Sequence, residues 1–267
     1  MKIHIVAATD KGYEQHTAVM LASLFANNKS NQFIVHLLHS DKSAGIGKLT
    51  KFINRKKHGC ELYEIKEASL SGFKISHHIS LATYFRLLIP ELIPATIGKI
   101  LYLDSDMVVL SNIDELWCTD VQNHAAAGVK DHFDRYEQLG ISHGYEYFNA
   151  GVMVWNLESI RKTDFTAEAI KYLHEKYDDI LYWDQDIINY LLQGKVKKIN
   201  KTWNVFPTDN LKEKKSARIV HYAGSVKPWN YPQDNSFDKY YFKYLMKTSW
   251  FLKCLTNRHY FISLFLK

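Results

Sequence analysis

The feature that most constrains the fold is a short apolar run, residues 100–103, followed at once by two aspartates one residue apart, Asp104 and Asp106. The run is typical of a buried strand, and buried carboxylates are costly unless they lie at its open end with water or a cation. Residues two apart on extended backbone point to the same side. The pair therefore suits a divalent cation that keeps positions open for phosphate oxygens. For the pair taken alone, a solvated turn after the strand is an equal alternative.

Strands and helices alternate through the first part of the chain. The expected order is strand 3–8, helix 17–25, strand 33–38, helix 46–58 and strand 61–65. This order predicts an α/β body with a mainly parallel central sheet flanked by helices. In such sheets ligands bind beyond the carboxyl ends of strands, where both Asp10 and the Asp104/Asp106 pair fall.

Two later strands bring further polar residues to the same kind of position. The strand predicted at 148–156 opens with Asn149, Ala150 and Gly151, and the strand before it ends in Asp131. Small residues at the start of a strand allow the backbone to approach a ligand closely. We therefore expect this stretch to line a binding site.

The segment 219–229 ends the predicted core. A strand carries His221, Gly224 permits a tight turn, and Lys227 follows. A lone histidine is more often structural than functional. A histidine at a strand end, beside a glycine turn and a lysine, favours metal and phosphate binding.

A helix is predicted at 77–90, with Ser80 as its cap and Pro90 at its end. Arg86 lies among apolar residues of this helix. Before other motifs are considered, it is expected to be a surface arginine whose stem covers its apolar neighbours.

A second pair of aspartates with the same spacing, Asp184-Gln185-Asp186, opens a helix predicted at 184–192. Carboxylates in the first turn of a helix complement its dipole. This predicts a structural role for Asp186, while Asp184 and Gln185 are free to face a cleft. A further helix is predicted at 165–177.

The net charge of +6 is concentrated at the C-terminal end. Residues 239–267 hold five Lys, one Arg and no acidic residue, so the other 28 basic and 28 acidic residues balance. A neutral body argues against a nucleic-acid partner. Three scattered cysteines (Cys60, Cys118 and Cys254) fit neither a disulfide framework nor a zinc site, which favours a reducing cytosol. No leader and no membrane span are expected from the sequence.

Four motifs in this order resemble glycosyltransferase family 8, whose members include bacterial lipooligosaccharide galactosyltransferases and glycogenin. They are Asp104-Ser105-Asp106, residues 148–152, Asp184-Gln185-Asp186 and residues 221–229. The resemblance runs from Ile3 to about Trp229. It implies a GT-A type nucleotide-sugar-binding fold, a UDP-hexose donor (galactose or glucose), Mn²⁺ with Mg²⁺ as a substitute, and retention of anomeric configuration.

The resemblance also assigns site residues by position. It implies that the metal is bound by Asp104, Asp106 and His221. It implies that the nucleotide and its diphosphate contact Ala8, Asp10, Ser105, Gly224 and Lys227. It implies that the donor sugar is surrounded by Arg86, Asn149, Ala150 and three residues expected to take part in catalysis, namely Asp131, Asp184 and Gln185.

Part of the expected chemistry follows from the residue types alone, without the resemblance. Glycosyl transfer develops negative charge on the departing UDP, which a divalent cation stabilises as a Lewis acid, and mixed carboxylate and imidazole ligation fits Mn²⁺ better than Mg²⁺. By resemblance, Gln185 stands where a double displacement needs its nucleophile, and an amide is a poor one. We therefore expect front-face attack, with the leaving phosphate taking the acceptor's proton and Gln185 stabilising the positively charged sugar.

Three other functions are weighed against this one. A self-glucosylating, glycogenin-like protein needs an acceptor tyrosine near the site, which 17 tyrosines allow. A sugar-nucleotide nucleotidyltransferase is expected to carry a Gly-rich, basic loop after the first strand, which residues 8–12 do not resemble. A non-catalytic carbohydrate-binding protein should have lost its metal ligands, and all three are present.

We divide the chain into a catalytic domain, residues 1–232, and a basic, aromatic C-terminal helical tail, residues 233–267. Lys239, Lys243 and Lys247 recur every four residues, so one face of a helix would be basic. The tail is either a helix packed on the body or an amphipathic segment on the anionic inner face of the cytoplasmic membrane. The second interpretation predicts a cytoplasmic, peripherally membrane-associated enzyme acting on a lipid-linked oligosaccharide or lipopolysaccharide core.

Overall fold

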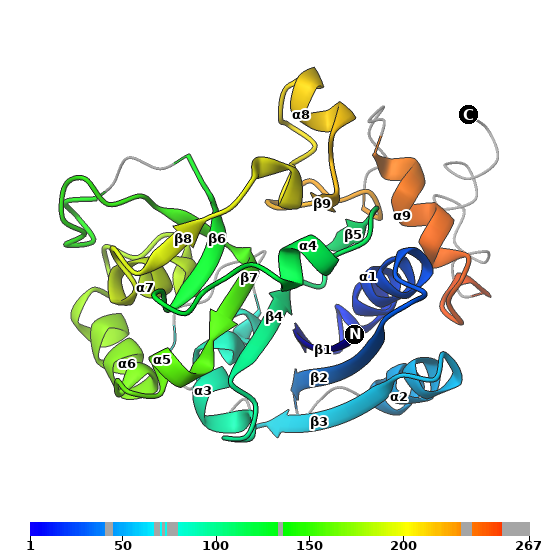
Figure 1. Ribbon diagram of the computed structural model, residues 1–267, viewed down its shortest axis with the longest axis horizontal. Coiled ribbons are helices and arrows are strands. Elements are labelled where there is room, and N and C mark those ends of the chain that lie inside the picture. Colours follow the sequence, from blue (N-terminus) through cyan, green and yellow to red (C-terminus); the bar gives the residue numbers. More distant parts are fainter. Residues whose placement is uncertain are drawn as a thin grey trace.

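The computed structural model describes residues 1–40, 45–66, 70, 73, 80–132, 136–230 and 237–252. Within these residues, seven strands form one sheet in the order β3-β2-β1-β4-β7-β6-β8 (Figure 1). In chain order they are β1 (Lys2–Thr9), β2 (Gln32–Ser40), β3 (Gly59–Ile65), β4 (Lys99–Leu103), β6 (Ala126–Lys130), β7 (Phe148–Asn156) and β8 (Val196–Lys198). A separate antiparallel ladder joins β5 (Met107–Val109) to β9 (Ile219–His221).

The directions of the strands decide where their ends meet. β3, β2, β1 and β4 are mutually parallel, which confirms the predicted mainly parallel sheet. β7, however, is antiparallel to both β4 and β6, which the sequence analysis did not predict. Because two reversals cancel, β6 runs in the same direction as β4. The carboxyl ends of β1, β4 and β6 and the amino end of β7 therefore share one edge of the sheet.

The β5–β9 ladder brings a distant segment to this edge. Met107 pairs with His221, and the backbone N–H of Tyr222 donates to the carbonyl of Asp106 at 2.9 Å. This pairing sets His221 beside the two aspartates that precede β5, although more than a hundred residues separate them in the chain.

Alternate residues of the central strands pack into two cores, one on each face of the sheet. On one face, Ile5 and Leu103 pack with residues of α1 (Glu14–Asn27), α2 (Ile46–Arg55) and α9 (Asp238–Leu245). On the other face, Ile100 and Tyr102 pack with residues of η2 (Leu81–Leu88), α3 (Ile89–Leu92), α6 (Phe165–Glu175) and α7 (Trp183–Leu191). Each fully buried aliphatic side chain stabilises the fold by about 1.5–3 kcal/mol, so this alternation fixes the direction of the side chains at the strand ends.

Shorter helical turns complete the described chain. They are α4 (Asp114–Trp117), α5 (Leu157–Ile160), η3 (Lys201–Trp203) and α8 (Leu211–Lys215).

The helix predicted at 77–90 takes a different form. Residues 77–79 lie outside the described residues, and the chain from Leu81 forms the 3-10 helix η2, followed by the short α3. Pro90 stands in the first turn of α3 rather than at the end of a helix, because N–H groups in a first turn need no helical partner. Ser80 precedes η2 in an extended conformation, but its side chain makes no capping hydrogen bond.

The described part of the predicted tail packs on the body. α9 lies beside α1 (Figure 1), and its residues Tyr241 and Phe242 are buried against it. Lys239, Lys243 and Lys247 are exposed, so the basic face points to solvent. Residues 253–267 lie outside the described residues. No helix in the described ranges is long and apolar enough to cross a membrane.

Candidate active site

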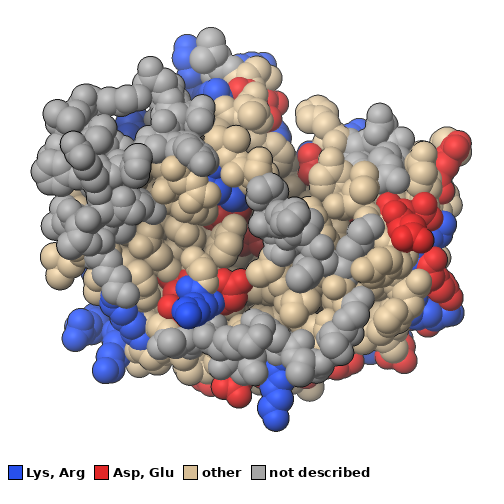
Figure 2. Space-filling view, turned by 180° about the vertical axis from the view of Figure 1, so that it is seen from behind, with Lys and Arg blue, Asp and Glu red and all other residues tan. Residues whose placement is uncertain are grey.

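A cavity of about 450 Å³ opens at the edge where these strand ends meet. Figure 2 shows a hollow on the face opposite to that of Figure 1, with acidic side chains at its floor. The predicted site residues other than Asp10 all line the cavity: Ala8, Arg86, Asp104, Ser105, Asp106, Asp131, Asn149, Ala150, Asp184, Gln185, His221, Gly224 and Lys227.

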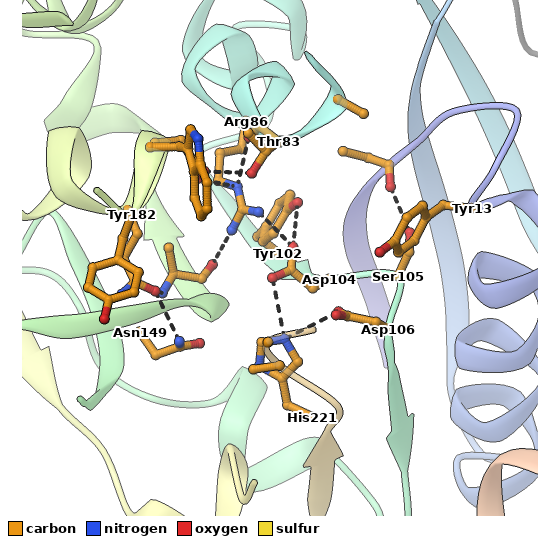
Figure 3. A pocket seen from close by; sticks show the side chains of 18 of the residues that line it. Tyr13, Thr83, Arg86, Tyr102, Asp104, Ser105, Asp106, Asn149, Tyr182 and His221 are labelled. Atoms are coloured by element: carbon orange, nitrogen blue, oxygen red, sulfur yellow. Dashed lines mark hydrogen bonds and ion pairs between the residues drawn. The ribbon is translucent and has the colours of Figure 1, made fainter. Parts of the chain in front are cut away.

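Asp104, Asp106 and His221 converge on one point in this cavity. One ligand atom of each lies within 4.8 Å of the others. His221 Nε2 is 3.2 Å from Asp106 Oδ1 and 3.6 Å from Asp104 Oδ2 (Figure 3). Burial alone would raise the pKa of Asp106, but Lys227 and His221 hold it well below its usual range, so this carboxylate is ionised. An imidazole and two carboxylates are a donor set that Mn²⁺ accepts.

Arg86 is buried, not at the surface as expected from its helix alone. Its Nη2 donates to Asp104 Oδ1 and its Nη1 to the carbonyl of Ala150, both at 2.8 Å, and the guanidinium lies 4.5 Å from the centre of the Tyr102 ring. Burial alone would lower the pKa of Arg86, but Asp104 and Asp184 raise it above its usual range. These partners replace water around the charge, which a snorkelling arginine keeps. Figure 3 shows Asp104 between Arg86 and His221.

Asp184 is a buried carboxylate that lines the cavity near Arg86. Its Oδ1 accepts a hydrogen bond from Thr83 Oγ1 at 2.6 Å. Its Oδ2 lies 2.7 Å from Arg86 Nε but makes no hydrogen bond, since that N–H donates to the Thr83 carbonyl. Burial raises the pKa of Asp184 to about 6, although Arg86 opposes the shift. The ion pair with Arg86 and the hydrogen bond from Thr83 hold this carboxylate in one orientation at the cavity wall.

Asp186 has the structural role predicted for it. It is fully buried and accepts hydrogen bonds from the Tyr147 hydroxyl at 2.5 Å and from the backbone N–H groups of Leu181 and Tyr182 at 2.8 Å. These bonds hold the turn that precedes α7. Trp183, which follows them, has a left-handed φ of 47° and lines the cavity, so strained backbone occurs at the site itself.

Gln185 is held on both sides of its amide. Its Oε1 accepts from the backbone N–H of Ala150 at 3.0 Å and from Asn149 Nδ2 at 2.9 Å. Its Nε2 lies 3.3 Å from both Asp131 Oδ2 and the Tyr147 hydroxyl. The amide is therefore fixed in orientation, and its carbonyl oxygen is already engaged twice.

The loop after β9 presents a positive charge to the cavity. Gly224 has a left-handed φ of 82°, which a residue with a side chain would adopt only with strain. Lys227 is buried, donates to the Tyr222 carbonyl at 2.6 Å and contacts Asp106 Oδ2.

An aromatic cluster of His16, Trp229 and Tyr241 anchors this loop to α1 and α9. The rings of His16 and Trp229 stack with centroids 3.6 Å apart, and Tyr241 lies 4.9 Å from Trp229. The Tyr241 hydroxyl is 2.6 Å from His16 Nδ1. α9 thus supports the segment that carries Lys227.

At the end of the cavity predicted to bind the nucleotide, Asp10 does not line the cavity as expected. Ser105 Oγ donates to the carbonyl of Ala8 at 2.7 Å, which ties β1 to the turn that carries Asp104 and Asp106. Asp10 lies beside the cavity, where its Oδ1 accepts from the N–H groups of Gly12 and Tyr13 at 2.8 and 3.0 Å. An aspartate that follows a strand commonly closes a turn in this way. Tyr13, which Asp10 positions, lines the cavity instead.

Several cavity residues were not predicted, and only some carried a signal. Tyr102 is two residues before Asp104 in an extended segment, so its place on the same side was deducible. Thr83 lies in η2 and Trp183 begins α7, so both belong to helical segments. Other cavity residues lie in loops, where sequence periodicity says nothing about direction, and they include Tyr13, His132, Tyr182 and Phe206.

We predict that Gly151→Ala weakens divalent-cation binding. A Cβ at Gly151 would lie 2.4 Å from His221 Cε1 and 2.7 Å from Asp104 Oδ2, so two ligands would have to move. Calorimetric titration with Mn²⁺ should show binding about tenfold weaker or worse. Gly128→Ala on β6 is the control, because its Cβ would meet no atom closer than 3.6 Å. Equal Mn²⁺ affinities for the Gly151 variant and the unchanged chain would contradict the prediction.

The sequence of this chain is similar to those of known proteins over most of its length. A family model described as glycosyl transferase family 8 matches residues 4–233. General stress protein A of Bacillus subtilis is 27% identical over 270 residues, which cover 93% of this chain and 94% of that protein. A lipopolysaccharide 1,2-glucosyltransferase of Escherichia coli is 26% identical over 247 residues, which cover 85% of this chain and 73% of that protein.

A solved structure of the galactosyltransferase LgtC, in complex with donor and acceptor sugar analogs, matches with a TM-score of 0.84 and 26% identity. The match covers 94% of this chain and 100% of that one. The predicted GT-A type α/β fold is thereby confirmed, and, with the family model spanning most of its length, the chain belongs to glycosyl transferase family 8.

Proposed function

We propose that this glycosyltransferase moves galactose or glucose from a UDP-sugar to a lipopolysaccharide or lipooligosaccharide core glycan, with Mn²⁺ as cofactor and an α-linked product. The observation that carries the proposal is the convergence of Asp104, Asp106 and His221 in a cavity of about 450 Å³. Ligand pockets commonly have volumes of about 300–1,000 Å³. Similarity to a lipopolysaccharide 1,2-glucosyltransferase and to the galactosyltransferase LgtC supports the substrate class.

Asp104, Asp106 and His221 would hold the cation, which when bound supplies a Lewis acid for the departing diphosphate. Lys227 adds a fixed positive charge at the same end of the cavity, since it is buried and touches Asp106. Arg86 keeps Asp104 in place from the other side. Such groups stabilise the leaving group without having to reorganise during the reaction.

The sugar end is lined by hydrogen-bonding groups whose own partners fix them. Asp184 and Asp131 are placed to accept bonds from sugar hydroxyls. Gln185 presents an amide whose Oε1 already accepts two hydrogen bonds, which lowers its capacity to attack carbon. This supports front-face transfer: the bond between the anomeric carbon and the UDP oxygen breaks, the acceptor oxygen bonds to that carbon on the same face, and its proton passes to the departing phosphate.

We predict that UDP stabilises the chain only together with Mn²⁺. Since ligand binding to the folded state raises the free energy of unfolding, the melting temperature should rise with UDP and Mn²⁺ and much less with GDP or CMP. Asp104→Ala should abolish the Mn²⁺-dependent part of this rise and lower transfer by about 10²-fold or more. Equal stabilisation by the three nucleotides, or full activity in excess chelator, would refute the donor and metal assignments respectively.

We predict an α-linked product from an α-linked donor. Gln185→Ala should lower kcat by about tenfold or more while the Kd for UDP stays nearly unchanged, because Gln185 faces the sugar and not the nucleotide. Gln193→Ala is a matched control: this glutamine is hydrogen-bonded to Ser142 and Tyr190 but is not among the cavity residues. NMR of the first-formed product identifies the linkage, and a β linkage would be incompatible with the proposal.

The same reaction mixture without acceptor tests the glycogenin-like alternative. Tyr182 lines the cavity and is 48% exposed, so it is the described tyrosine to which a sugar would most readily be transferred. Intact-mass measurement with Mn²⁺ and UDP-sugar should show no added hexose. Successive additions of hexose mass would favour the alternative.

We also propose that the C-terminal end places the enzyme on the cytoplasmic side of an anionic membrane. Lys239 and Lys243 lie on the exposed face of α9, and Lys247, two residues after its end, is exposed as well. The following 15 residues, 253–267, add three more basic residues and no acidic one. Basic groups near an anionic surface contribute about 1 kcal/mol each, so the attraction would be reversible and salt-sensitive.

We predict that a chain ending at Leu252 retains UDP-sugar hydrolysis but binds anionic vesicles more weakly. Losing three basic groups should lower vesicle affinity by roughly 10²-fold, measured by co-sedimentation at low salt. Replacing Lys239, Lys243 and Lys247 with glutamine should weaken binding without disturbing the core, since the three side chains are exposed. Unchanged vesicle binding in both variants would exclude a membrane role for this end.

A further inference from the structure

A buried asparagine outside the predicted site, Asn204, joins the metal ligands to the sugar-binding residues. It follows η3 and is 0% exposed. Its Oδ1 lies 3.0 Å from His221 Nδ1, and its Nδ2 donates to Asn149 Oδ1 at 2.7 Å. The backbone holds this placement, because the N–H of Val205 donates to the carbonyl of Ile219 and the N–H of His221 donates to the carbonyl of Val205.

The direction of each hydrogen bond in this group follows from a backbone N–H, which can only donate. The N–H of Gly151 lies 3.0 Å from Asn149 Oδ1, so that atom is an acceptor. Asn204 must then turn its NH₂ toward Asn149 and its carbonyl oxygen toward His221. Since a carbonyl oxygen only accepts, His221 Nδ1 must carry a hydrogen, and Nε2 is the nitrogen left for a cation.

The same reasoning orients the amides on the sugar side. The N–H of Ala150 donates to Gln185 Oε1, and Asn149 Nδ2 donates to the same oxygen. Gln185 Nε2 therefore faces Asp131. Three amides, those of Asn204, Asn149 and Gln185, form one directional series from the histidine to the residue proposed to stabilise the sugar.

We propose that Asn204 is a positioning residue that holds His221 with its hydrogen on Nδ1 and couples the cation site to the orientation of Gln185. The proposal rests on the cation site of the proposed function. Hydrogen-bond partners of ligating histidines fix the ring and its tautomer, and their removal typically weakens metal affinity by about 10–100-fold. In this chain the partner is an amide that also donates to Asn149, a residue of the proposed sugar site, so one buried side chain contacts both halves of the cavity.

The hydrogen on His221 can be located without any variant. The full chain, labelled with ¹⁵N in histidine, is examined by long-range ¹⁵N–¹H NMR with Mg²⁺ and UDP, which are diamagnetic. The expected spectrum has Nδ1 protonated and Nε2 unprotonated. A protonated Nε2 with bare Nδ1 would overturn this inference alone. Absence of any cation-dependent change in the spectrum would sink the cation site, and this inference with it.

Two substitutions then separate positioning from simple burial. Asn204→Ala removes both hydrogen bonds, and the Mn²⁺ affinity, measured by electron paramagnetic resonance, should fall by about 10–100-fold. Asn204→Asp keeps an oxygen toward Nδ1 but no donor toward Asn149. The Asn204→Asp chain should therefore bind Mn²⁺ at most about threefold more weakly than the unchanged chain. That loss is smaller than the one expected when the hydrogen-bond partner of a ligating histidine is removed. The substitution should also raise the KM for the UDP-sugar while leaving the affinity for UDP unchanged.

The control is Asn200→Ala in the same turn. Asn200 is exposed, and its side chain caps η3 by accepting from the N–H of Thr202 at 2.9 Å. Its removal disturbs the turn but not the amide series, so Mn²⁺ affinity should be unaffected. An Asn204→Ala chain that binds Mn²⁺ as tightly as this control would overturn the proposal. So would an Asn204→Asp chain that binds Mn²⁺ as weakly as Asn204→Ala while both melt cooperatively.

Discussion

The fold depends on neutralising carboxylates that are withdrawn from water at one edge of the sheet. The side chains of Asp104, Asp106 and Asp184 are only 19%, 13% and 4% exposed. Leaving buried charges of this kind unpaired would cost several kcal/mol. Arg86 and Lys227, which supply the compensating charges, come from segments on opposite sides of the cavity. The chain therefore has to close around the carboxylates before the sheet edge is stable.

This balance also suits the cavity to the donor proposed for it. A divalent cation carries two positive charges, and the diphosphate of a UDP-sugar carries two negative ones, so their joint entry leaves the net charge of the site unchanged. The carboxylates and their basic partners can then exchange some contacts without creating an uncompensated charge. The hydrogen-bonded amides beyond them carry no charge and hold their directions through backbone N–H groups.

The sequence predicts the parts of the site that follow strands, because the ends of neighbouring strands meet by rule. Asp104, Asp106 and His221 follow or end predicted strands, whereas Asn149 was predicted from the small residues at the start of its strand. The sequence does not show which residues a given side chain will contact in the fold. Arg86 has the pattern of a surface arginine, and its burial depends on the carboxylate that follows β4, a carbonyl of β7 and an ion pair with Asp184 of α7.

The same limit applies to loops and to the C-terminal end. Asn204 carries no periodic or motif signal, since its importance comes from contacts with residues 149 and 221. In α9, lysines every four residues with aromatic residues between them fit a membrane-bound helix and a packed helix equally well. The aromatic residues pack on α1, while the lysines remain in water, so one pattern serves both a core and an exposed basic face.

The aromatic cluster of His16, Trp229 and Tyr241 changes where the functional unit ends. The match to the family model ends at residue 233, but Tyr241 closes the cluster on Trp229, which itself lies two residues beyond Lys227. A chain cut at the family limit would expose Trp229 and His16 to water and release the loop from its support. The folded unit that supports Lys227 therefore includes α9, and a helix beyond the limit of the family model sets the rigidity of the loop at this end of the cavity.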